Sequence, residues 1–226
     1  MKKYYFITLL ITSFSAYSQA PRGFYLTAGF SQTALETKDL LTTPGAGFMA
    51  GVDFNFGYHE TYNYQFEAVY NQSVLNLKST DYNLIDVKES KYKYSNIELG
   101  FYLNYYIIKP DEDKFFLGPQ LGGFIALVDP IQPSKGADVN GELYLPYLLD
   151  ESDLQDTSQF NYGAGIGLTG GYNDFRFDLR YSLGFANLLS GIEVQSPGYY
   201  DDNNRYTGPV LEAKTRGFSF GISYKL

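Results

Sequence analysis

The sequence contains no cysteine, no tryptophan and one histidine. Without cysteine it can form no disulfide framework and offers no thiol for a lipid anchor. It also lacks an apolar run approaching the roughly 20 residues that a membrane-spanning helix needs. Basic residues are outnumbered, since 17 Lys and Arg against 25 Asp and Glu give a formal net charge of −8. A chain this acidic is a poor ligand for polyanions, so we expect no nucleic-acid partner.

The N-terminus has the three regions of an export signal. Lys2 and Lys3 are followed by an apolar run over 4–11 and by a small-residue stretch over 12–18. This order predicts a secretory signal peptide over residues 1–18, cleaved after Ser18, and a single domain over 19–226. An uncleaved membrane anchor is the alternative, but its apolar core is too short to cross a bilayer.

Aromatic residues and glycine are abundant, with 23 Tyr, 18 Phe and 23 Gly. Glycine weakens helices, whereas Tyr and Phe favour strands. Residues 217–226, GFSFGISYKL, place five large apolar side chains on one strand face and small or polar residues on the other. The same alternation predicts strands over eight segments, which are 23–32, 45–57, 62–74, 91–108, 114–128, 159–172, 175–186 and 217–226.

The connections between these segments alternate between short turns and long loops. This asymmetry, with an even strand count, is typical of a transmembrane barrel with its termini at the periplasmic end. A soluble barrel also alternates, but it would show water a polar face rich in Lys and Glu. Here the polar faces carry mainly small residues, as in Gly163, Gly165 and Gly167, which suit a crowded interior. We therefore predict an all-β fold, an eight-stranded antiparallel up-and-down transmembrane β-barrel.

The terminal GFSFGISYKL, the strand pattern, the loop asymmetry and the Ser-Gln at the end of the signal carry a resemblance. The chain resembles the eight-stranded outer-membrane barrels of Bacteroidetes-type bacteria, often labelled porin-like or PorT-like. The resemblance implies a Gram-negative outer-membrane location and contact with outer-membrane lipid. It covers nearly the whole chain beyond the signal, but none of its motifs is catalytic.

Six charged residues fall on the predicted inward faces: Asp53, Glu67, Glu98, Arg176, Asp178 and Arg180. Buried charges must be paired, and Arg offers a two-pronged donor to a carboxylate. We expect Arg180 to reach Glu67 or Glu98 across the lumen. The cluster then acts either as a structural plug or as the gate of a narrow ion path.

The longest predicted loop, Asp129 to Ser158, is acidic but contains an apolar run. Its candidate contact residues are Leu143, Tyr144, Leu145, Tyr147, Leu148 and Leu149. Such residues in a surface loop indicate packing against the barrel rim, a lipid or a protein partner. The carboxylates match no calcium-loop pattern, so we predict neither a metal nor a cofactor.

These observations predict a non-enzymatic outer-membrane protein, structural or adhesive, or part of a membrane assembly that acts through its external loops. The alternative is a small pore for ions or small solutes. Catalysis is not expected, because a hydroxyl nucleophile needs a positioned base. His59 is the only histidine and falls in a short turn at the predicted periplasmic end.

Overall fold

The computed structural model describes residues 22–57, 59, 61–80, 87–110, 115–134, 143–144, 149, 153–194, 201, 205 and 207–226. Within these residues the long strands are β1 (Gly23–Glu36), β2 (Thr42–Phe56), β3 (Tyr62–Thr80), β4 (Val87–Tyr105), β5 (Phe115–Val128), β8 (Phe160–Tyr172), β9 (Phe175–Gly184) and β10 (Lys214–Lys225). The short elements are β6 (Gln132–Pro133), β7 (Leu143–Tyr144) and the 3₁₀ turn η1 (Asp153–Asp156). No helix in this part of the chain is long and apolar enough to cross a membrane.

The long strands form a closed antiparallel ring. Each pairs with its neighbour in the order β1, β2, β3, β4, β5, β8, β9, β10, and β10 returns to β1. The closing pair runs in unbroken register from Tyr25 opposite Lys225 to Glu36 opposite Lys214. Among the described residues eight long strands therefore make an up-and-down barrel, which confirms the predicted fold class, including each predicted strand.

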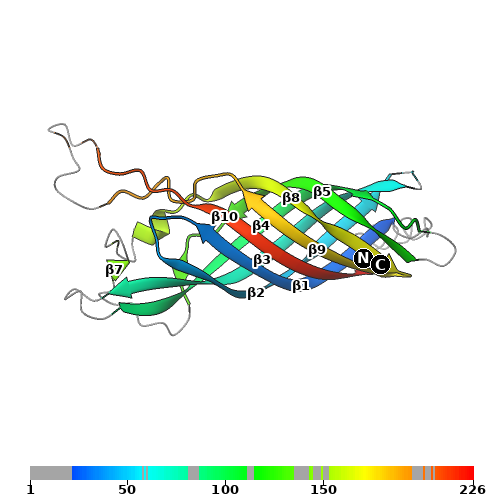
Figure 1. Cartoon of the computed structure of the whole chain (residues 1–226), viewed down its shortest axis with the longest axis horizontal. Helices are drawn as coiled ribbons and strands as arrows, with labels where there is room; N and C mark the ends of the chain where they lie inside the picture. The colour runs from blue at the N-terminus through cyan, green and yellow to red at the C-terminus, as the bar shows by residue number, and fades with distance from the viewer. Residues whose placement is uncertain are drawn as a thin grey trace, which may run out of the picture.

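The two ends of the barrel differ. The first residue of β1 and the last of β10 lie at one end, together with the tight connection from β8 to β9 (Figure 1). We call this end the turn end. That connection is Asn173 and Asp174, and Asn173 has a φ of 54°, a left-handed conformation that Asn tolerates. The longer connections lie at the opposite end, which we call the loop end (Figure 1).

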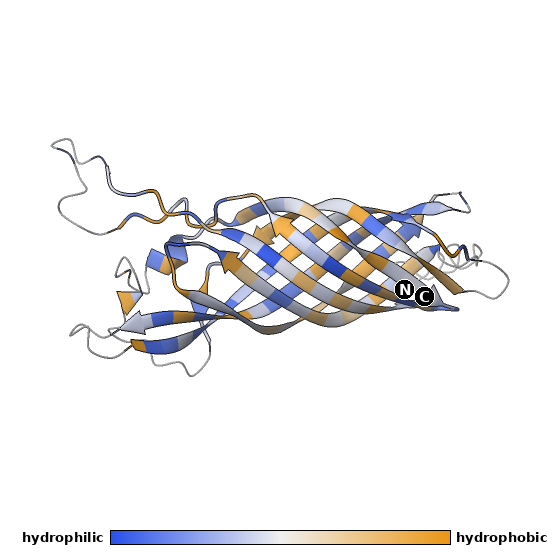
Figure 2. Cartoon of the chain, viewed as in Figure 1, coloured by the Kyte–Doolittle hydropathy of each residue, from blue (hydrophilic) through white to orange (hydrophobic). Residues whose placement is uncertain are grey.

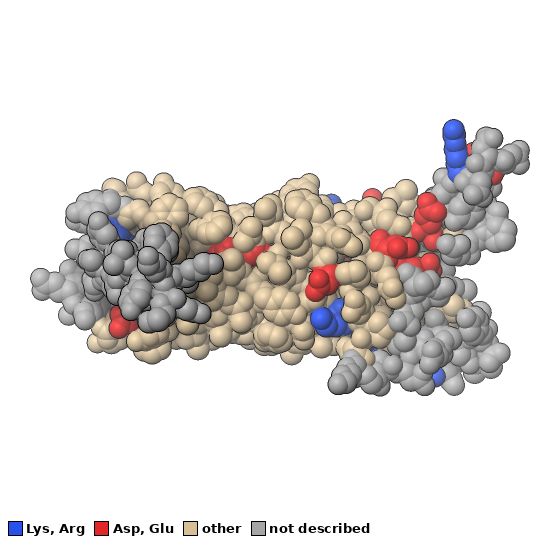
Figure 3. Space-filling model, turned by 180° about the vertical axis from the view of Figure 1, so that it is seen from behind, with Lys and Arg blue, Asp and Glu red and all other residues tan. Residues whose placement is uncertain are grey.

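The outer wall is apolar. Hydrophobic and hydrophilic residues alternate along the strands in Figure 2, and most of the wall seen in Figure 3 carries no charged side chain. Large exposed side chains form the belt, as in Leu26, Phe220 and Ile166. Near the turn end the aromatic rings Phe24, Phe54 and Phe56 stack in sequence at 4.5 and 5.6 Å between centroids. An apolar belt edged by aromatic rings is the surface that a barrel presents to lipid.

Two strands run further than the sequence pattern predicted. β3 and β4 form a hairpin that continues to Thr80 and Val87, where a loop was expected over 75–90. The physical reason is burial: Leu75, Leu77 and Tyr92 point inward beyond the belt and are fully buried. The expected loop over 33–44 is likewise shorter, because β1 reaches Glu36 and β2 begins at Thr42.

An apolar core closes the loop end, and we call it the cap core. It joins inward strand residues to residues from the connections, namely Leu35, Leu40, Leu75, Leu77, Tyr92, Tyr94, Val128, Ile131, Tyr144, Leu149, Leu154, Leu188, Leu189, Ile192, Val194, Leu211 and Ala213. β7 pairs with the end of β3, and the Tyr144 ring meets Tyr92 edge-on at 5.4 Å. The connections are therefore folded onto the mouth of the barrel.

This core changes the interpretation of the candidate contact run. Tyr144 and Leu149 are buried at 0% and 1% exposure, so they pack within the protein instead of forming a contact surface. Leu143 is partly exposed and pairs with Thr80 of β3. Leu145, Tyr147 and Leu148 lie outside the described residues, as do the predicted signal peptide and its cleavage site.

Candidate functional site

The lumen is filled by two polar networks, centred on Arg180 and Arg176, two inward residues of β9 with the inward Asp178 between them. In the first, the Arg180 guanidinium donates hydrogen bonds to both carboxylate oxygens of Glu67 on β3, and its Nη2 lies 3.0 Å from Oε2. Arg180 Nε also donates to Gln120 Oε1 on β5 at 2.9 Å. The two sides of the barrel are thus joined across the lumen by a two-pronged ion pair, the strongest geometry for Arg and a carboxylate.

The space for this pair comes from glycine and an aromatic ring. The Arg180 guanidinium lies over the Tyr102 ring, 3.7 Å from its centroid. A Cβ added at Gly100 would come within 2.5 Å of the Tyr102 ring and 2.8 Å of Glu67 Cγ. One added at Gly165 would meet Arg180 Cδ at 3.1 Å. Small residues on the inward faces of β4 and β8 therefore make room for the large side chains.

Toward the turn end, the first network continues as a ladder of amides. Gln120 donates to Gln65 Oε1 at 2.9 Å and to Asn104 Oδ1 at 2.8 Å, and Asn104 donates to Asn63 Oδ1 at 2.9 Å. Gln65 in turn donates to Glu67 Oε2 at 3.0 Å. All four amide residues are buried. On the turn-end side of the ion pair, the lumen is therefore filled by amide side chains that hydrogen-bond to one another.

The second network surrounds Arg176, which is 0% exposed. Its Nη1 lies 2.7 Å from Asp53 Oδ1 on β2, and its Nε lies 2.8 Å from Asp178 Oδ2. Ser223 and Thr27 lie between β9 and β2: Ser223 accepts from Arg176 Nη2 at 3.1 Å, and Thr27 donates to Asp53 Oδ2 at 2.5 Å. Asp178 Oδ1 is buried with no hydrogen-bond partner among the described atoms.

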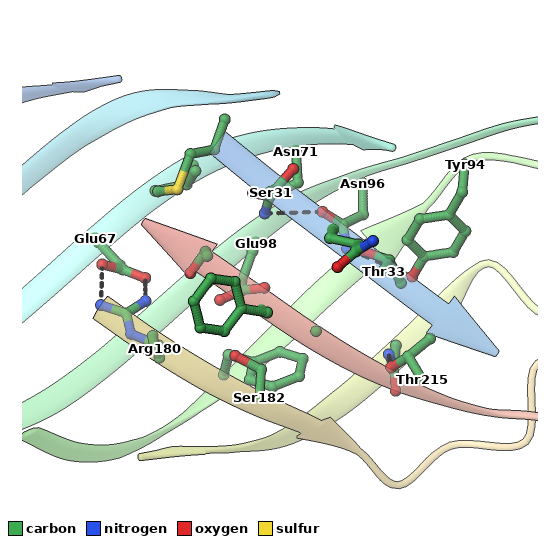
Figure 4. Close-up of a pocket in the computed structure, with 18 residues that line it drawn as sticks. Ser31, Thr33, Glu67, Asn71, Tyr94, Asn96, Glu98, Arg180, Ser182 and Thr215 are labelled. Carbon is green, nitrogen blue, oxygen red and sulfur yellow. Dashed lines mark hydrogen bonds and ion pairs between the residues drawn. The ribbon is translucent and has the colours of Figure 1, made fainter. Parts of the chain in front are cut away.

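Glu98 stands apart from both Arg groups. It lies between the Arg180–Glu67 pair and the polar side chains toward the loop end (Figure 4). Within the described residues its hydrogen bonding is limited to the Tyr102 hydroxyl, 3.5 Å from Oε1. It faces a cavity of about 50 Å³ lined by polar groups that include Asn71, Asn96 and Ser182. Of the two partners expected for Arg180, the structure places Glu67 in contact and leaves Glu98 on the cavity.

Sequence reasoning missed the uncharged members of the site. Tyr25, Tyr102 and Gln120 line the lumen, and Arg176 also lies over the Tyr25 ring at 4.6 Å. Each occupies an inward position of its own strand, so the period of two could have identified it. The tyrosines were hidden because an aromatic residue in such a strand is normally expected on the lipid face.

The remaining candidates lie away from the lumen. His59 is exposed in the β2–β3 turn, where its Nδ1 lies 2.7 Å from the Thr61 hydroxyl and its ring stacks on Tyr62. The described part of the chain contains no group of three or more His, Cys, Asp or Glu that could hold a metal ion. Several acids of the predicted 129–158 loop, among them Asp150 and Glu151, lie outside that part.

Comparison with known protein families identifies the family of this barrel. Residues 17–190, well over half of the chain, match the model of the outer membrane protein beta-barrel domain. The chain belongs to this family. It is an outer-membrane β-barrel, which agrees with the lipid-facing belt and bears out the family expectation at this level. No curated protein matches the chain in sequence.

Solved structures share the barrel fold at low identity. Neisserial surface protein A is 12% identical with a TM-score of 0.46, and the match covers 90% of this chain and 97% of that one. OprG from Pseudomonas aeruginosa is 11% identical with a TM-score of 0.46, and the match covers 92% and 98%. At such identity the likeness concerns the fold alone.

One similar structure corrects an expectation. The outer membrane enzyme PagL is 8% identical with a TM-score of 0.43, and the match covers 89% of this chain and 99% of that one. The prediction that this protein is not an enzyme, which rested on the position of His59, is therefore wrong as it stands, because a protein with a similar barrel is an outer membrane enzyme. The position of His59 alone does not determine whether the protein is an enzyme.

Proposed function

We propose that this outer-membrane barrel is closed to ions and acts through its loop end. It would serve as a structural or adhesive protein, or as a component of a membrane assembly of the PorT-like type. The observation that carries the proposal is the filled lumen, in which Arg180, Glu67 and Gln120 bridge β9, β3 and β5. An interior of eight strands is just wide enough to be filled by side chains, and here charged and amide groups fill it.

The cap core adds support from the loop end. Leu188, Leu189 and Leu211 come from the long connection between β9 and β10, and they pack with β3 and β4 residues over the barrel mouth. Burying apolar side chains of a connection gives it a defined shape, whereas a connection without a core stays an open chain. A shaped surface at the outer end suits recognition better than free passage of solutes.

The conductance of the purified protein tests closure. In planar lipid bilayers we expect no large, steady conductance from the wild-type protein. The double variant Arg180→Ala, Glu67→Ala removes the bridge without leaving either charge unpaired, so it is expected to show more channel events. A large, steady conductance of the wild type would favour the small-pore alternative and overturn closure.

The side of the membrane on which the loop end lies needs a separate test. Because the sequence contains no cysteine, a single introduced thiol is the only one that a maleimide can label on this protein. Gln155→Cys places one thiol on η1 at the loop end, and Asp174→Cys places one at the turn end. A membrane-impermeant maleimide added to intact cells is expected to label Gln155→Cys alone. Labelling of Asp174→Cys alone would reverse the orientation and refute an external role for the loop end.

A further inference from the structure

The cavity beside Glu98 is a small, partly open chamber within the barrel, lined by both polar and apolar side chains. It lies between the Arg180–Glu67 pair and the cap core, and its volume is about 50 Å³. Asn71 and Ser182 on its wall are partly exposed. One water molecule needs about 10–15 Å³, so the chamber has room for an ion together with a few waters.

The charges around the chamber do not balance. Arg180 is committed to Glu67 through two hydrogen bonds, which leaves Glu98 as an additional carboxylate on the wall. Glu98 is only 9% exposed, and its Oε2 receives no hydrogen bond from the described residues. A buried carboxylate without a cation is costly, so a further positive charge in the chamber would be stabilised.

The remaining wall supplies neutral oxygen atoms. The Asn71 amide donates to Asn96 Oδ1 at 3.1 Å, which leaves the Asn71 carbonyl oxygen available as an acceptor. The hydroxyls of Thr33, Ser182 and Ser219 also border the chamber. One carboxylate with amide and hydroxyl oxygens compensates a single positive charge. A tight calcium site would use several carboxylates, and no group of three or more acids or histidines forms within the described residues.

We propose that the chamber binds one monovalent metal cation, Na⁺ or K⁺, against Glu98. The ion takes the Glu98 carboxylate as its anchor and amide, hydroxyl and water oxygens as its other ligands. Binding neutralises the one lumen carboxylate that has no basic partner among the described residues. The site depends on the chamber and on Glu98, so it does not require the loop end to have a partner.

Thermal unfolding of the full-length protein refolded in detergent tests the proposal. Melting is followed by far-UV circular dichroism at pH 8 and one ionic strength, in NaCl, KCl or N-methyl-D-glucamine chloride, whose cation is too large for the chamber. The wild type is expected to melt roughly 2–4 °C higher in the better alkali salt, the shift that about a fivefold excess over Kd gives a chain of this size. Glu98→Gln keeps the shape, removes the charge and is expected to lose this difference.

Glu89→Gln is the matched control, because Glu89 is an exposed carboxylate on the same strand. It should retain the wild-type response to alkali cations. Equal melting of the wild type in all three salts, with a dependence on pH alone, would mean that Glu98 takes up a proton instead and would overturn the proposal. So would a salt difference that survives in Glu98→Gln. Crystals soaked in Rb⁺ give the direct readout, an anomalous peak beside Glu98 that is absent from Glu98→Gln.

Discussion

Arg180 and Arg216 show how the same chemistry has different consequences at different depths. Each guanidinium contacts one glutamate, Glu67 or Glu36. The Arg180–Glu67 side chains are 5% and 4% exposed, whereas the Arg216–Glu36 side chains are 47% and 54% exposed. Water screens the second pair and not the first, so only the first is expected to matter for stability.

Arg180→Ala is predicted to lower the free energy of unfolding by about 3–5 kcal/mol, because Glu67 is left as a buried charge without its partner. Urea titration of the refolded protein in lipid vesicles measures the change. Arg216→Ala is the control, and little or no change is expected from it because its partner remains hydrated. Equal losses in the two variants would contradict a stabilising role for the buried pair.

Among the strands, β10 closes the ring by pairing with β1, and its outward face lies on the lipid-facing wall. Its outward residues Phe218, Phe220 and Ile222 are exposed in the barrel wall, while Ser223 and Gly221 face inward and are buried. Phe220 pairs with Phe30 on β1 and with Leu179 on β9. The strand therefore contributes to stability in two ways, through its hydrogen bonds to both neighbours and through an unbroken apolar face.

Phe220→Arg is predicted to destabilise the protein in lipid vesicles by about 2–4 kcal/mol, the cost of a guanidinium near the bilayer midplane. Urea titration again measures it. Lys78→Arg serves as the control, because Lys78 is an exposed cation on the part of β3 that extends beyond the belt. If Phe220→Arg were as stable as the wild type, the outer wall at this position would not face hydrocarbon.

At the scale of the whole molecule, closure of the ring determines physical behaviour. Each long strand has two hydrogen-bonded neighbours, because β10 pairs with β1 through the register given above. A closed ring leaves no edge at which detergent or another chain can begin to separate the strands.

The native protein is predicted to fractionate with outer membranes and to migrate faster on a detergent gel before heating than after it. Deletion of residues 217–226 removes most of β10, opens the ring and should abolish the mobility difference. Recovery of the intact protein from the soluble periplasmic fraction would argue against a membrane barrel.

The positions of the strands and the orientation of their faces follow from the sequence alone. Side chains in a strand alternate with a period of two, so GFSFGISYKL shows its lipid face without any knowledge of its neighbours. The charged residues Asp53, Glu67 and Arg180 were assigned inward for the same reason. The Asn173–Asp174 turn was also readable, because Asn tolerates the left-handed conformation that it adopts.

Which side chains become partners depends on the three-dimensional arrangement of the strands and connections. Arg180 had two glutamates within reach, and the choice of Glu67 depends on strand register and on the space that Gly100 and Gly165 leave around Tyr102. Tyr144 belongs to a run that suggested an exposed contact surface, yet it is buried against Tyr92. Alternation is a local property of one strand, whereas register, cavity volume and the folding of connections depend on residues far apart in the chain.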